Sequence, residues 1–431
     1  MKDSIRLCLS LYACEPHRGS EPGVGWAWAL GMAKRHETWV LTRANNREVI
    51  EAELDRLSIP AAERPHFLWV DMPRWVQYLK KRGFVPITLY YLLWQFAARR
   101  AWDRSGIAVD IIHHVTFCSY VIPGVWWHRK EKIVLGPLGG TSICPRPFLR
   151  EFSPVRRLSE WKRGLGRRLW FLDPFYLLSR ASADALLFVD SASATRMGGR
   201  FRHVSTLLDV SVPEKLFDPS FDAPRDRVRQ FVWAGTLGGH KAGGVAIRAF
   251  AKAFGHESNP PRLLMFGKGP EGRNLERLAR NLGVGNFIEF RGSVPQETLW
   301  MEISRSIAFV FTSVRDTCGS VSVEALACGT PLVCFQHQGV GEVVDKSCGI
   351  SVQSGSYISA VCDFSAAMRR LADDADLVQR LGSSGRKRAL ANFTWKRKFD
   401  EADDCYKTIM TSSAMARSSR SPTPPSAKSR G

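Results

Sequence analysis

Residues 307–335 read IAFVFTSVRDTCGSVSVEALACGTPLVCF. The run at 307–312 is mostly apolar and contains aromatic and β-branched side chains, which predicts a buried strand. Gly319 and the small residues around it then open a helix-length segment, and Gly329-Thr330-Pro331 closes that segment before a second apolar run at 331–335. Two apolar strands joined through a helix predict a parallel sheet with helices on its faces.

The same alternation extends through the chain on both sides of this stretch. Further strand candidates are 5–12, 38–42, 66–70, 109–114, 132–136 and 185–189, followed by 230–234, 262–266 and 286–291. A polar stretch at 213–229 separates the two series. Because 431 residues also exceed the size of one ordinary core, we predict an α/β fold with two doubly wound domains, at 1–215 and 225–395.

The composition is strongly basic, with 61 Lys and Arg against 41 Asp and Glu. Such an excess favours a polyanionic partner, which could be nucleic acid, a phosphate-bearing substrate or an anionic membrane surface. No nucleic-acid motif accompanies the charge, so no nucleic-acid partner is expected. The longest apolar stretch, 84–98, has 15 residues and is too short to span a bilayer, which needs about 20.

The ten cysteines are scattered and none forms a Cys-x-x-Cys pair. This pattern is typical of buried thiols in a reducing compartment rather than of a disulfide framework or a zinc site, and it predicts a cytoplasmic protein. The acidic run at 373–376 is explained as the first turn of a surface helix, where acids meet the helix dipole. No metal site is therefore expected.

Two glycine-rich turns follow predicted strands. The first, at 19–26, contains Gly23 and Gly25 and precedes an amphipathic segment, so its amides could meet an anion, although a tight turn needs glycine in any case. The second contains Gly235 and Thr236 and leads to Lys241. Lys241 would be a compact charge for a diphosphate, or simply a solvated lysine at a helix start.

Asp316 and Glu324 are the acids of the opening stretch. They stand eight positions apart, a spacing that lets both side chains line one cleft. The amides of residues 319–321 would receive an anionic group at the helix start, and Glu324 could accept a pair of sugar hydroxyls.

These motifs together resemble family 4 glycosyltransferases over about residues 5–408. The most specific block is Glu324-Ala-Leu-Ala-Cys-Gly-Thr-Pro331, with Asp316 before it. It is accompanied by GKGP at 267–270, RGSVP at 291–295, GVGEVV at 339–344, CEP at 14–16, DIIHHVT at 110–116 and GPLGG at 136–140.

The resemblance implies the GT-B fold, in which two Rossmann-like domains face each other and a C-terminal helix, here 396–411, returns to the first domain. The Ser-, Pro- and Arg-rich end at 412–431 is expected to be a disordered basic tail. The activity implied is a retaining, metal-independent hexosyl transfer in which a nucleotide sugar is the donor substrate and no cofactor is needed. The first domain would hold the acceptor and the second domain the donor.

The resemblance also implies a set of donor-binding residues, which are Gly23, Gly25, Gly235, Thr236, Lys241, Gly292, Val294, Cys318, Gly319, Ser320, Val321 and Glu324. The base would lie near 292–294 and the ribose on Glu324. Lys241 and the amides after Cys318 would hold the diphosphate. Asp316 would face the transferred sugar.

One of two adjacent histidines, His113 and His114, would lie near the reacting carbon, with His114 slightly favoured. The family usually carries Arg where this chain has Thr236, so Lys241 alone, His240 or Arg291 must supply the charge, or catalysis is impaired. The family also more often has Glu at the position of Asp316, which is one methylene shorter.

Two basic and aromatic segments, 146–180 and 78–100, could rest on an anionic membrane and face a lipid-linked acceptor. An ordinary helical cover of the first sheet explains them equally well. The function expected is sugar transfer to a polysaccharide or lipid-linked glycan precursor, on or near the inner face of a membrane. The alternatives are a catalytically weak homologue that binds nucleotide sugar or a partner, and a basic membrane or nucleic-acid scaffold.

Overall fold

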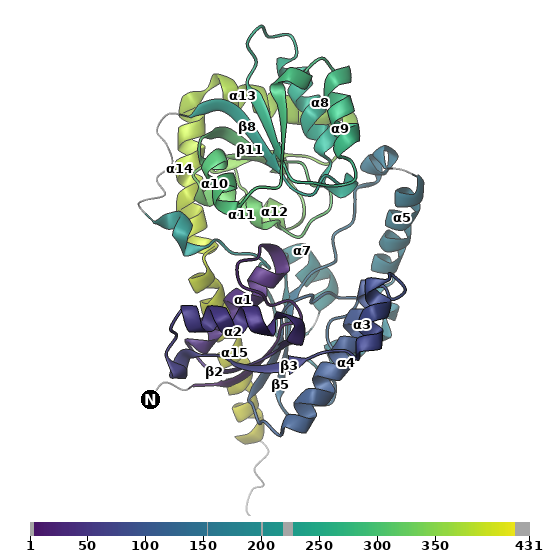
Figure 1. Cartoon of the computed structure of the whole chain (residues 1–431), viewed down its shortest axis with the longest axis vertical. Helices are drawn as coiled ribbons and strands as arrows, with labels where there is room; N and C mark the ends of the chain where they lie inside the picture. The colour runs from purple at the N-terminus through teal and green to yellow at the C-terminus, as the bar shows by residue number, and fades with distance from the viewer. Residues whose placement is uncertain (1–3, 153, 200, 219–226, 419–431) are drawn as a thin grey trace, which may run out of the picture.

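The computed structural model describes residues 4–152, 154–199, 201–218 and 227–418. Two sheets, each flanked by helices, occupy the two ends of an elongated molecule (Figure 1). The first sheet has seven strands in the order β3-β2-β1-β4-β5-β6-β7, and the second has six in the order β10-β9-β8-β11-β12-β13. Strand pairing is parallel throughout both sheets. The predicted α/β fold with two doubly wound sheets is confirmed.

The strands of the first sheet are β1 (Arg6–Ser10), β2 (Glu37–Arg43), β3 (His66–Val70), β4 (Ile111–His114), β5 (Lys132–Leu138), β6 (Ala185–Phe188) and β7 (Val204–Thr206). The helices around it are α1 (Ser20–Ala33), α2 (Arg47–Arg56), α3 (Arg74–Lys81), α4 (Ile87–Ser105), α5 (Pro154–Arg168), α6 (Pro174–Ser182) and α7 (Ser191–Ser193). Sequence analysis missed β7, because this edge strand has three residues and two of them are exposed, so it carries no apolar run.

The strands of the second sheet are β8 (Val228–Ala234), β9 (Arg262–Phe266), β10 (Ile288–Gly292), β11 (Ser306–Phe311), β12 (Leu332–Phe335) and β13 (Gly349–Val352). Its helices are α8 (Gly243–Phe254), α9 (Gly272–Asn281), α10 (Gln296–Ser304), α11 (Ser320–Ala327), α12 (Gln338–Val343), α13 (Tyr357–Asp373) and α14 (Ala375–Asn392). All six residues of β11 are buried, as its continuous apolar run predicts. The short edge strand β13 was not predicted.

The strand order of each sheet reverses at one point. In the second sheet β8 lies between β9 and β11, and in the first sheet β1 lies between β2 and β4. The loops that leave the carboxyl ends of the two central strands diverge to opposite faces at such a point, which leaves a crevice where ligands of open α/β sheets bind. The topology therefore predicts that a ligand binds at the loops after β8 and β11.

The last helix, α15 (Trp395–Ser418), returns to the first domain, as predicted (Figure 1). Phe399, Ala402 and Tyr406 join the core that also contains strand residues of β1 and β4. The Tyr406 hydroxyl lies 2.6 Å from Nδ1 of His113 on β4. The helix continues past the predicted end at 411, and residues 419–431 of the predicted tail lie outside the described residues.

Two of the places where the chain crosses between the domains, one before β8 and one after α14, are paired. The amide of Val212, before β8, donates to the carbonyl of Phe393, which follows α14, over 2.7 Å. Lys398 at the start of α15 is buried, and its ammonium donates to the carbonyl of Val210 over 2.8 Å. The two domains are thus joined along one edge by two adjacent segments.

The segment around η3 (Arg146–Glu151) corrects one expectation. Phe148 and Phe152 are buried in the core cluster of the second domain, although they belong to the first half of the sequence. The Phe148 ring lies 5.3 Å from the Phe335 ring at an interplanar angle of 84°. Because these side chains pack inside the protein, the beginning of 146–180 is not available to a membrane surface.

All ten cysteines lie within the described residues as free thiols, and eight of them are buried. This confirms the prediction of buried thiols. Among the described residues, no helix combines the length and the apolar character needed to cross a bilayer. Within the same residues, no group of three or more His, Cys, Asp or Glu side chains is arranged to hold a metal ion.

Replacing Tyr406 with Phe should destabilise the first domain. The change leaves Nδ1 of the fully buried His113 without its partner, which should lower the free energy of unfolding by about 1–3 kcal/mol. Urea denaturation followed by circular dichroism measures this loss. Tyr78→Phe, at a side chain that is 54% exposed, is the control and should change stability by less than about 0.5 kcal/mol. Equal stability of the two variants would contradict the assigned role of α15.

Candidate active site

The crevice of the second domain brings together a lysine and an aspartate from two different loops. Lys241 ends the short helix η8 (Gly239–Lys241) after β8, and Asp316 lies in the loop between β11 and α11. The Lys241 ammonium forms an ion pair with Oδ2 of Asp316 and lies 5.6 Å from the centre of the Phe311 ring. A diphosphate that binds here would compete with Asp316 for this ammonium.

The amino end of α11 faces the same loop. Gly319 precedes the helix with a φ of +77°, and a Cβ at this position would lie 3.0 Å from the Phe311 ring, so only glycine is accommodated without strain. The next residues are Ser320 and Val321, whose amides belong to the first turn of the helix. Cys318 is fully buried, with its sulfur 3.3 Å from the Ser322 hydroxyl, and therefore contributes packing rather than a reactive thiol.

Glu324 is held inside the second domain by two donors from α10. Trp300 Nε1 donates to Oε2 over 2.7 Å, and Gln296 Nε2 donates to Oε1 over 3.1 Å. The side chain is only 3% exposed, and this burial raises the pKa of the carboxyl. Each carboxylate oxygen keeps further lone pairs, so the arrangement is compatible with hydroxyl donors from a ribose. The ribose contact stays a prediction.

Three glycine loops meet at the carboxyl ends of β8, β9 and β10. The amide of Gly267 donates to the carbonyl of Gly292 over 2.7 Å, and a Cβ at Gly267 would lie 2.0 Å from the Gly235 carbonyl oxygen. These loops need glycine because their backbones touch. Val294 is half-buried beside them and Thr236 is exposed. Packing alone explains the glycines, and the base contact at 292–294 stays a prediction.

Lys241, His240 and Arg291 were the cations expected to compensate for Thr236, and Arg315 joins these candidates in the structure. Burial, and then the charges of Arg315 and Lys241, lower the pKa of His240 to about 4, so its ring is neutral at pH 7. Arg291 is half exposed and forms an ion pair with Glu289 over 2.5 Å. Arg315 directly precedes Asp316, is 19% exposed, and acts electrostatically on both His240 and Asp316. Arg315 was not among the predicted site residues, although it stands directly before Asp316 in the sequence.

The glycines predicted on the first domain are required by packing. A Cβ on Gly23 would lie 2.0 Å from the Arg18 carbonyl oxygen, and one on Gly25 would lie 1.9 Å from the Ala13 carbonyl oxygen. Both residues belong to the first turns of α1, whose amino end faces the second domain in Figure 1. Their contact with a diphosphate stays a prediction.

Both candidate histidines are fully buried, and protein groups contact all four ring nitrogens. His113 lies 2.6 Å from the Tyr406 hydroxyl and 2.8 Å from the Gly136 carbonyl oxygen. His114 lies 2.9 Å from the Ser10 hydroxyl and 2.7 Å from the Tyr91 hydroxyl. Burial lowers the pKa of each ring to about 3, so both are neutral. Their role near the reacting carbon stays a prediction.

A pocket of about 580 Å³ lies between the domains and is called the interdomain pocket below. Most of its wall comes from the first domain, including Tyr91, the partner of His114, and Thr317 reaches it from the second domain. The Ser142 hydroxyl donates to the Asp316 carbonyl over 2.9 Å and ties the two sides together near this place. The pocket is therefore next to the Lys241–Asp316 pair.

Two carboxylates that sequence analysis did not select line the interdomain pocket. Glu21 accepts a hydrogen bond from the amide of Phe117 over 3.2 Å, and burial together with the charge of Asp209 raises its pKa to about 7. Asp209 accepts from the Thr317 hydroxyl over 2.6 Å, and burial raises its pKa also. A carboxyl that titrates near pH 7 can exchange a proton with a substrate hydroxyl.

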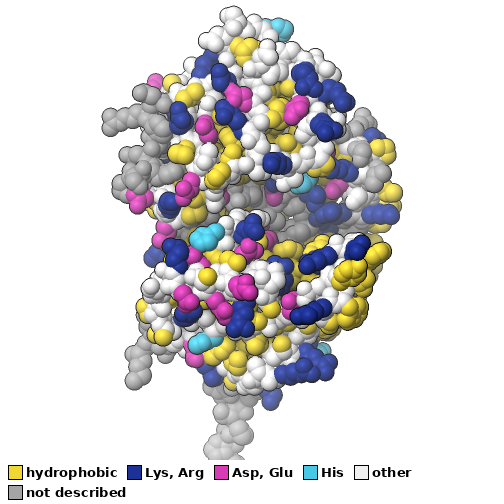
Figure 2. All heavy atoms as spheres, in the orientation of Figure 1, with side chains coloured by type: hydrophobic (Ala, Val, Ile, Leu, Met, Phe, Trp, Pro, Cys, Tyr) yellow, Lys and Arg dark blue, Asp and Glu magenta, His cyan; other side chains and the backbone are white. Residues whose placement is uncertain are grey.

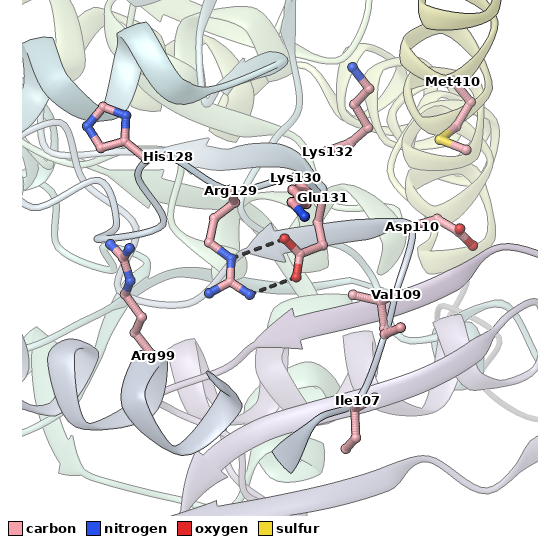
Figure 3. A pocket seen from close by; sticks show the side chains of 11 residues that line it. Arg99, Ile107, Val109, Asp110, His128, Arg129, Lys130, Glu131, Lys132 and Met410 are labelled. Carbon is pink, nitrogen blue, oxygen red and sulfur yellow. Dashed lines mark hydrogen bonds and ion pairs between the residues drawn. The ribbon is translucent and has the colours of Figure 1, made fainter. Parts of the chain in front are cut away.

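A larger cavity, of about 810 Å³, lies elsewhere on the first domain (Figure 3). Asp110 and Lys132 line it at the amino ends of β4 and β5, and Arg129 in its wall forms a double hydrogen bond with Glu131 at 2.7 and 3.1 Å. Ligands of open α/β sheets bind at the carboxyl ends of the strands. This cavity is at the opposite edge, so its size alone does not make it the site.

The second domain matches a known family. Residues 219–388 match the family model described as glycosyl transferases group 1, which covers less than half of the chain. The D-inositol 3-phosphate glycosyltransferase of Streptomyces bingchenggensis is 31% identical over 137 residues, which are 32% of this chain and 29% of that protein. The GDP-mannose-dependent alpha-(1-6)-phosphatidylinositol monomannoside mannosyltransferase of Mycolicibacterium smegmatis is 28% identical over 235 residues, 50% of this chain and 59% of that protein. The chain spans less than two thirds of either relative.

Solved structures resemble the whole chain. Anabaena HepE, crystallised in complex with UDP, is 15% identical with a TM-score of 0.60 over 94% of this chain and 100% of that chain. At this identity the likeness shows the fold alone, which is the GT-B arrangement of glycosyltransferases.

Glu21 should make stability depend on pH. Between about pH 4.5 and 7 the folded carboxyl keeps a proton that the unfolded chain has lost, so its stabilising effect is complete below pH 4.5 and disappears as the pH rises through about 7. Glu21→Gln stays neutral and should flatten the decline in the free energy of unfolding between pH 5 and 8, by on the order of 1–2 kcal/mol. Urea titrations across this range measure the effect.

The exposed carboxyl of α2 supplies the control. Glu48→Gln should follow the wild-type profile, because this side chain lies in solvent. A profile of Glu21→Gln that runs parallel to the wild type would contradict the raised pKa.

Proposed function

We propose that the chain transfers a sugar from a nucleotide-sugar donor to an acceptor hydroxyl held between its two domains. The observation that carries the proposal is the meeting of Lys241, Asp316 and the amino end of α11 in the crevice of the domain that matches group 1 glycosyl transferases. The carboxylates of the interdomain pocket stand on the acceptor side. The nucleotide would bind the second domain, with its ribose on Glu324.

Cleavage of a glycosyl phosphate bond leaves negative charge on the diphosphate. Preorganised donors at the leaving group are usually the largest contribution to such a reaction. Lys241 and the first amides of α11 would supply them, and the charge of Arg315 beside Asp316 would compensate for the arginine that Thr236 replaces. Glu21 would accept the proton of the acceptor hydroxyl, since its pKa near 7 suits a general base.

The finer assignment follows the family resemblance of the motifs. We propose a family 4 enzyme of the hexosyltransferase type that retains the anomeric configuration and needs no metal ion. Asp316 would hold hydroxyls of the transferred sugar, and His114 would act through Tyr91, whose hydroxyl it contacts at 2.7 Å. The ten free thiols support a reducing compartment, the cytoplasm.

The donor site can be tested with a panel of UDP-, GDP- and ADP-sugars. One donor should bind and release its nucleotide slowly, and Lys241→Ala should weaken its binding roughly 10- to 100-fold, the loss expected for a charge-assisted contact. Glu324→Ala should reduce affinity for the same donor. Calorimetry measures binding, and a coupled nucleotide assay measures release.

Two exposed residues of the second domain supply matched controls. Lys252→Ala on α8 and Glu297→Ala on α10 should leave donor affinity unchanged. If no nucleotide sugar binds the wild-type protein, the site is misassigned. Tight binding with no turnover for any acceptor would favour the catalytically weak homologue.

We also propose that part of the first domain rests on an anionic membrane. Most of the exposed large hydrophobic side chains in the described residues lie between 75 and 177, and Trp75, Phe84 and Trp161 are 61–75% exposed. Figure 2 shows hydrophobic side chains gathered over α3 and α4 and bordered by lysine and arginine side chains. Exposed Lys81 and Lys162 belong to the same segments. Apolar side chains beside basic ones match an anionic bilayer surface better than a neutral protein partner.

Vesicle sedimentation tests this surface. The protein should bind phosphatidylglycerol vesicles more tightly than phosphatidylcholine vesicles, and Phe84→Ser or Trp161→Ser should each weaken binding about tenfold, since each removes one apolar side chain from the contact. Ile358→Ser, at a side chain of the second domain that is 76% exposed, should have no effect. An equal loss in all three variants would show that the surface is not specific.

A further inference from the structure

The interdomain pocket has a basic part that the proposed donor site does not use. Arg163 and Arg167 stand one turn apart on α5 and both line the pocket. Arg167 is only 7% exposed, and its Nη1 has no hydrogen-bond partner among the described residues. A buried guanidinium with an unsatisfied nitrogen is costly, so its presence needs an explanation.

The charges around Arg167 do not neutralise it. Burial, followed by the repulsion of Arg163 and Arg315, lowers its pKa to about 10, which still leaves the group cationic at pH 7. The carboxylate close to the cluster is Glu160, which lies 3.4 Å from Nε of Arg315 and 3.9 Å from Nε of Arg163. Glu160 is thus shared by three guanidinium groups, and Asp316 also acts on Arg315.

The two acids of the pocket belong to another part of it. Glu21 interacts with Asp209 and with the amide of Phe117, and none of the three arginines affects its pKa. The electrostatic neighbours of Arg167 are instead Tyr120, the other two arginines and Glu160. The pocket thus has a cationic part and a separate carboxylic part.

A glycine in the helix widens the pocket at the arginines. Gly166 lies inside α5 and lines the pocket, and a Cβ built on it would contact nothing within 4 Å. Glycine inside a helix lowers stability relative to alanine, and packing within the protein does not require it here. Open space next to a guanidinium nitrogen that has no hydrogen-bond partner is what an anionic ligand needs.

The remaining wall is mostly apolar, apart from Thr88, Ser119 and Thr317, and it continues to the outer surface. Tyr91, Phe117 and Ile122 line the pocket, together with Ile87 and Val121, which are each 47% exposed. Ile87 opens α4, which carries the exposed apolar side chains described above. A ligand in this pocket therefore meets charge at one part and a path of apolar side chains at another.

We propose that the interdomain pocket binds a phosphate-bearing amphiphile as the acceptor, with its phosphate on Arg163 and Arg167 and its hydrocarbon along Ile87 and Val121. This deepens the proposed function and rests on it. A guanidinium fork matches phosphate oxygens in a bidentate way. The carboxylate of Glu21 in the same pocket would then face the hydroxyl that receives the sugar.

Farnesyl phosphate, farnesol and inorganic phosphate are suitable probes, and calorimetry at constant ionic strength measures their binding. Farnesyl phosphate should bind at least tenfold more tightly than either of the other two. Arg167→Gln should reduce this affinity at least tenfold and Arg163→Gln by a smaller factor, whereas Arg167→Lys should keep part of it. Arg168→Gln is the matched control, because this arginine is exposed on the same helix and does not line the pocket.

Gly166→Ala separates binding from folding. It should raise the melting temperature, because alanine favours the helix. It should also weaken the binding of farnesyl phosphate, because the added methyl group would enter the pocket. Thermal melting of Arg167→Gln checks that any loss of affinity is not a loss of fold.

Binding of UDP, GDP and ADP to the same variants separates the two proposals. If nucleotide binds and farnesyl phosphate does not, the acceptor proposal is wrong and the donor site stands. Equal affinity for farnesyl phosphate and inorganic phosphate would exclude a contribution of the apolar wall. If Arg167→Gln loses affinity for nucleotide but keeps its affinity for farnesyl phosphate, the arginines bind the donor diphosphate instead. If neither ligand binds the wild-type protein, the proposed function itself fails.

Discussion

The parallel pairing of β8 with β11 is the constraint on which the site depends. These strands lie at the reversal of strand order, so the loops that follow them open a crevice at the same edge of the sheet. Lys241 and Asp316 are 75 positions apart in the chain and become an ion pair only through this pairing. The first domain repeats the arrangement with β1 and β4, and its carboxyl edge supplies the wall that faces the crevice.

Sequence patterns predicted features that depend on local order. The bounds of β3 and β9 agree with the predicted ranges, because each is a run of four apolar residues that stands between a basic residue and either Asp71 or Gly267. Gly319 was predicted at a helix start, and its φ of +77° gives the physical reason. Strands β7 and β13 escaped prediction because three or four residues at a sheet edge are held by their neighbours rather than by their own composition.

Residues whose environment is created by domain contact were not predictable. In the sequence, nothing distinguished Glu21 from the other residues of its glycine-rich turn. Its pKa rises toward 7 because of burial between the domains and the nearby charge of Asp209. Arg167 was one of nine basic residues in its segment. It is buried and Arg168 is exposed because the two side chains lie on different faces of α5. Phe148 was expected either on a membrane surface or on the cover of the first sheet, and it packs in the second domain instead. The burial and the pKa of such side chains depend on tertiary contacts, which the sequence alone does not show.

The paired crossings at Val212 and Phe393 limit how the two halves can move. Two bodies joined along one edge can rotate about the line of that edge, whereas sliding and twisting would break the bond between the crossings. Phe148 and Phe152, which are buried in the core of the second domain, oppose this rotation as well. Points move in proportion to their distance from such an axis. In Figure 1 the crossings lie on one side of the molecule and α5 on the other, where Arg156 pairs with Glu271 over 2.5 Å. Because this ion pair lies far from the axis, it resists the rotation of one domain relative to the other.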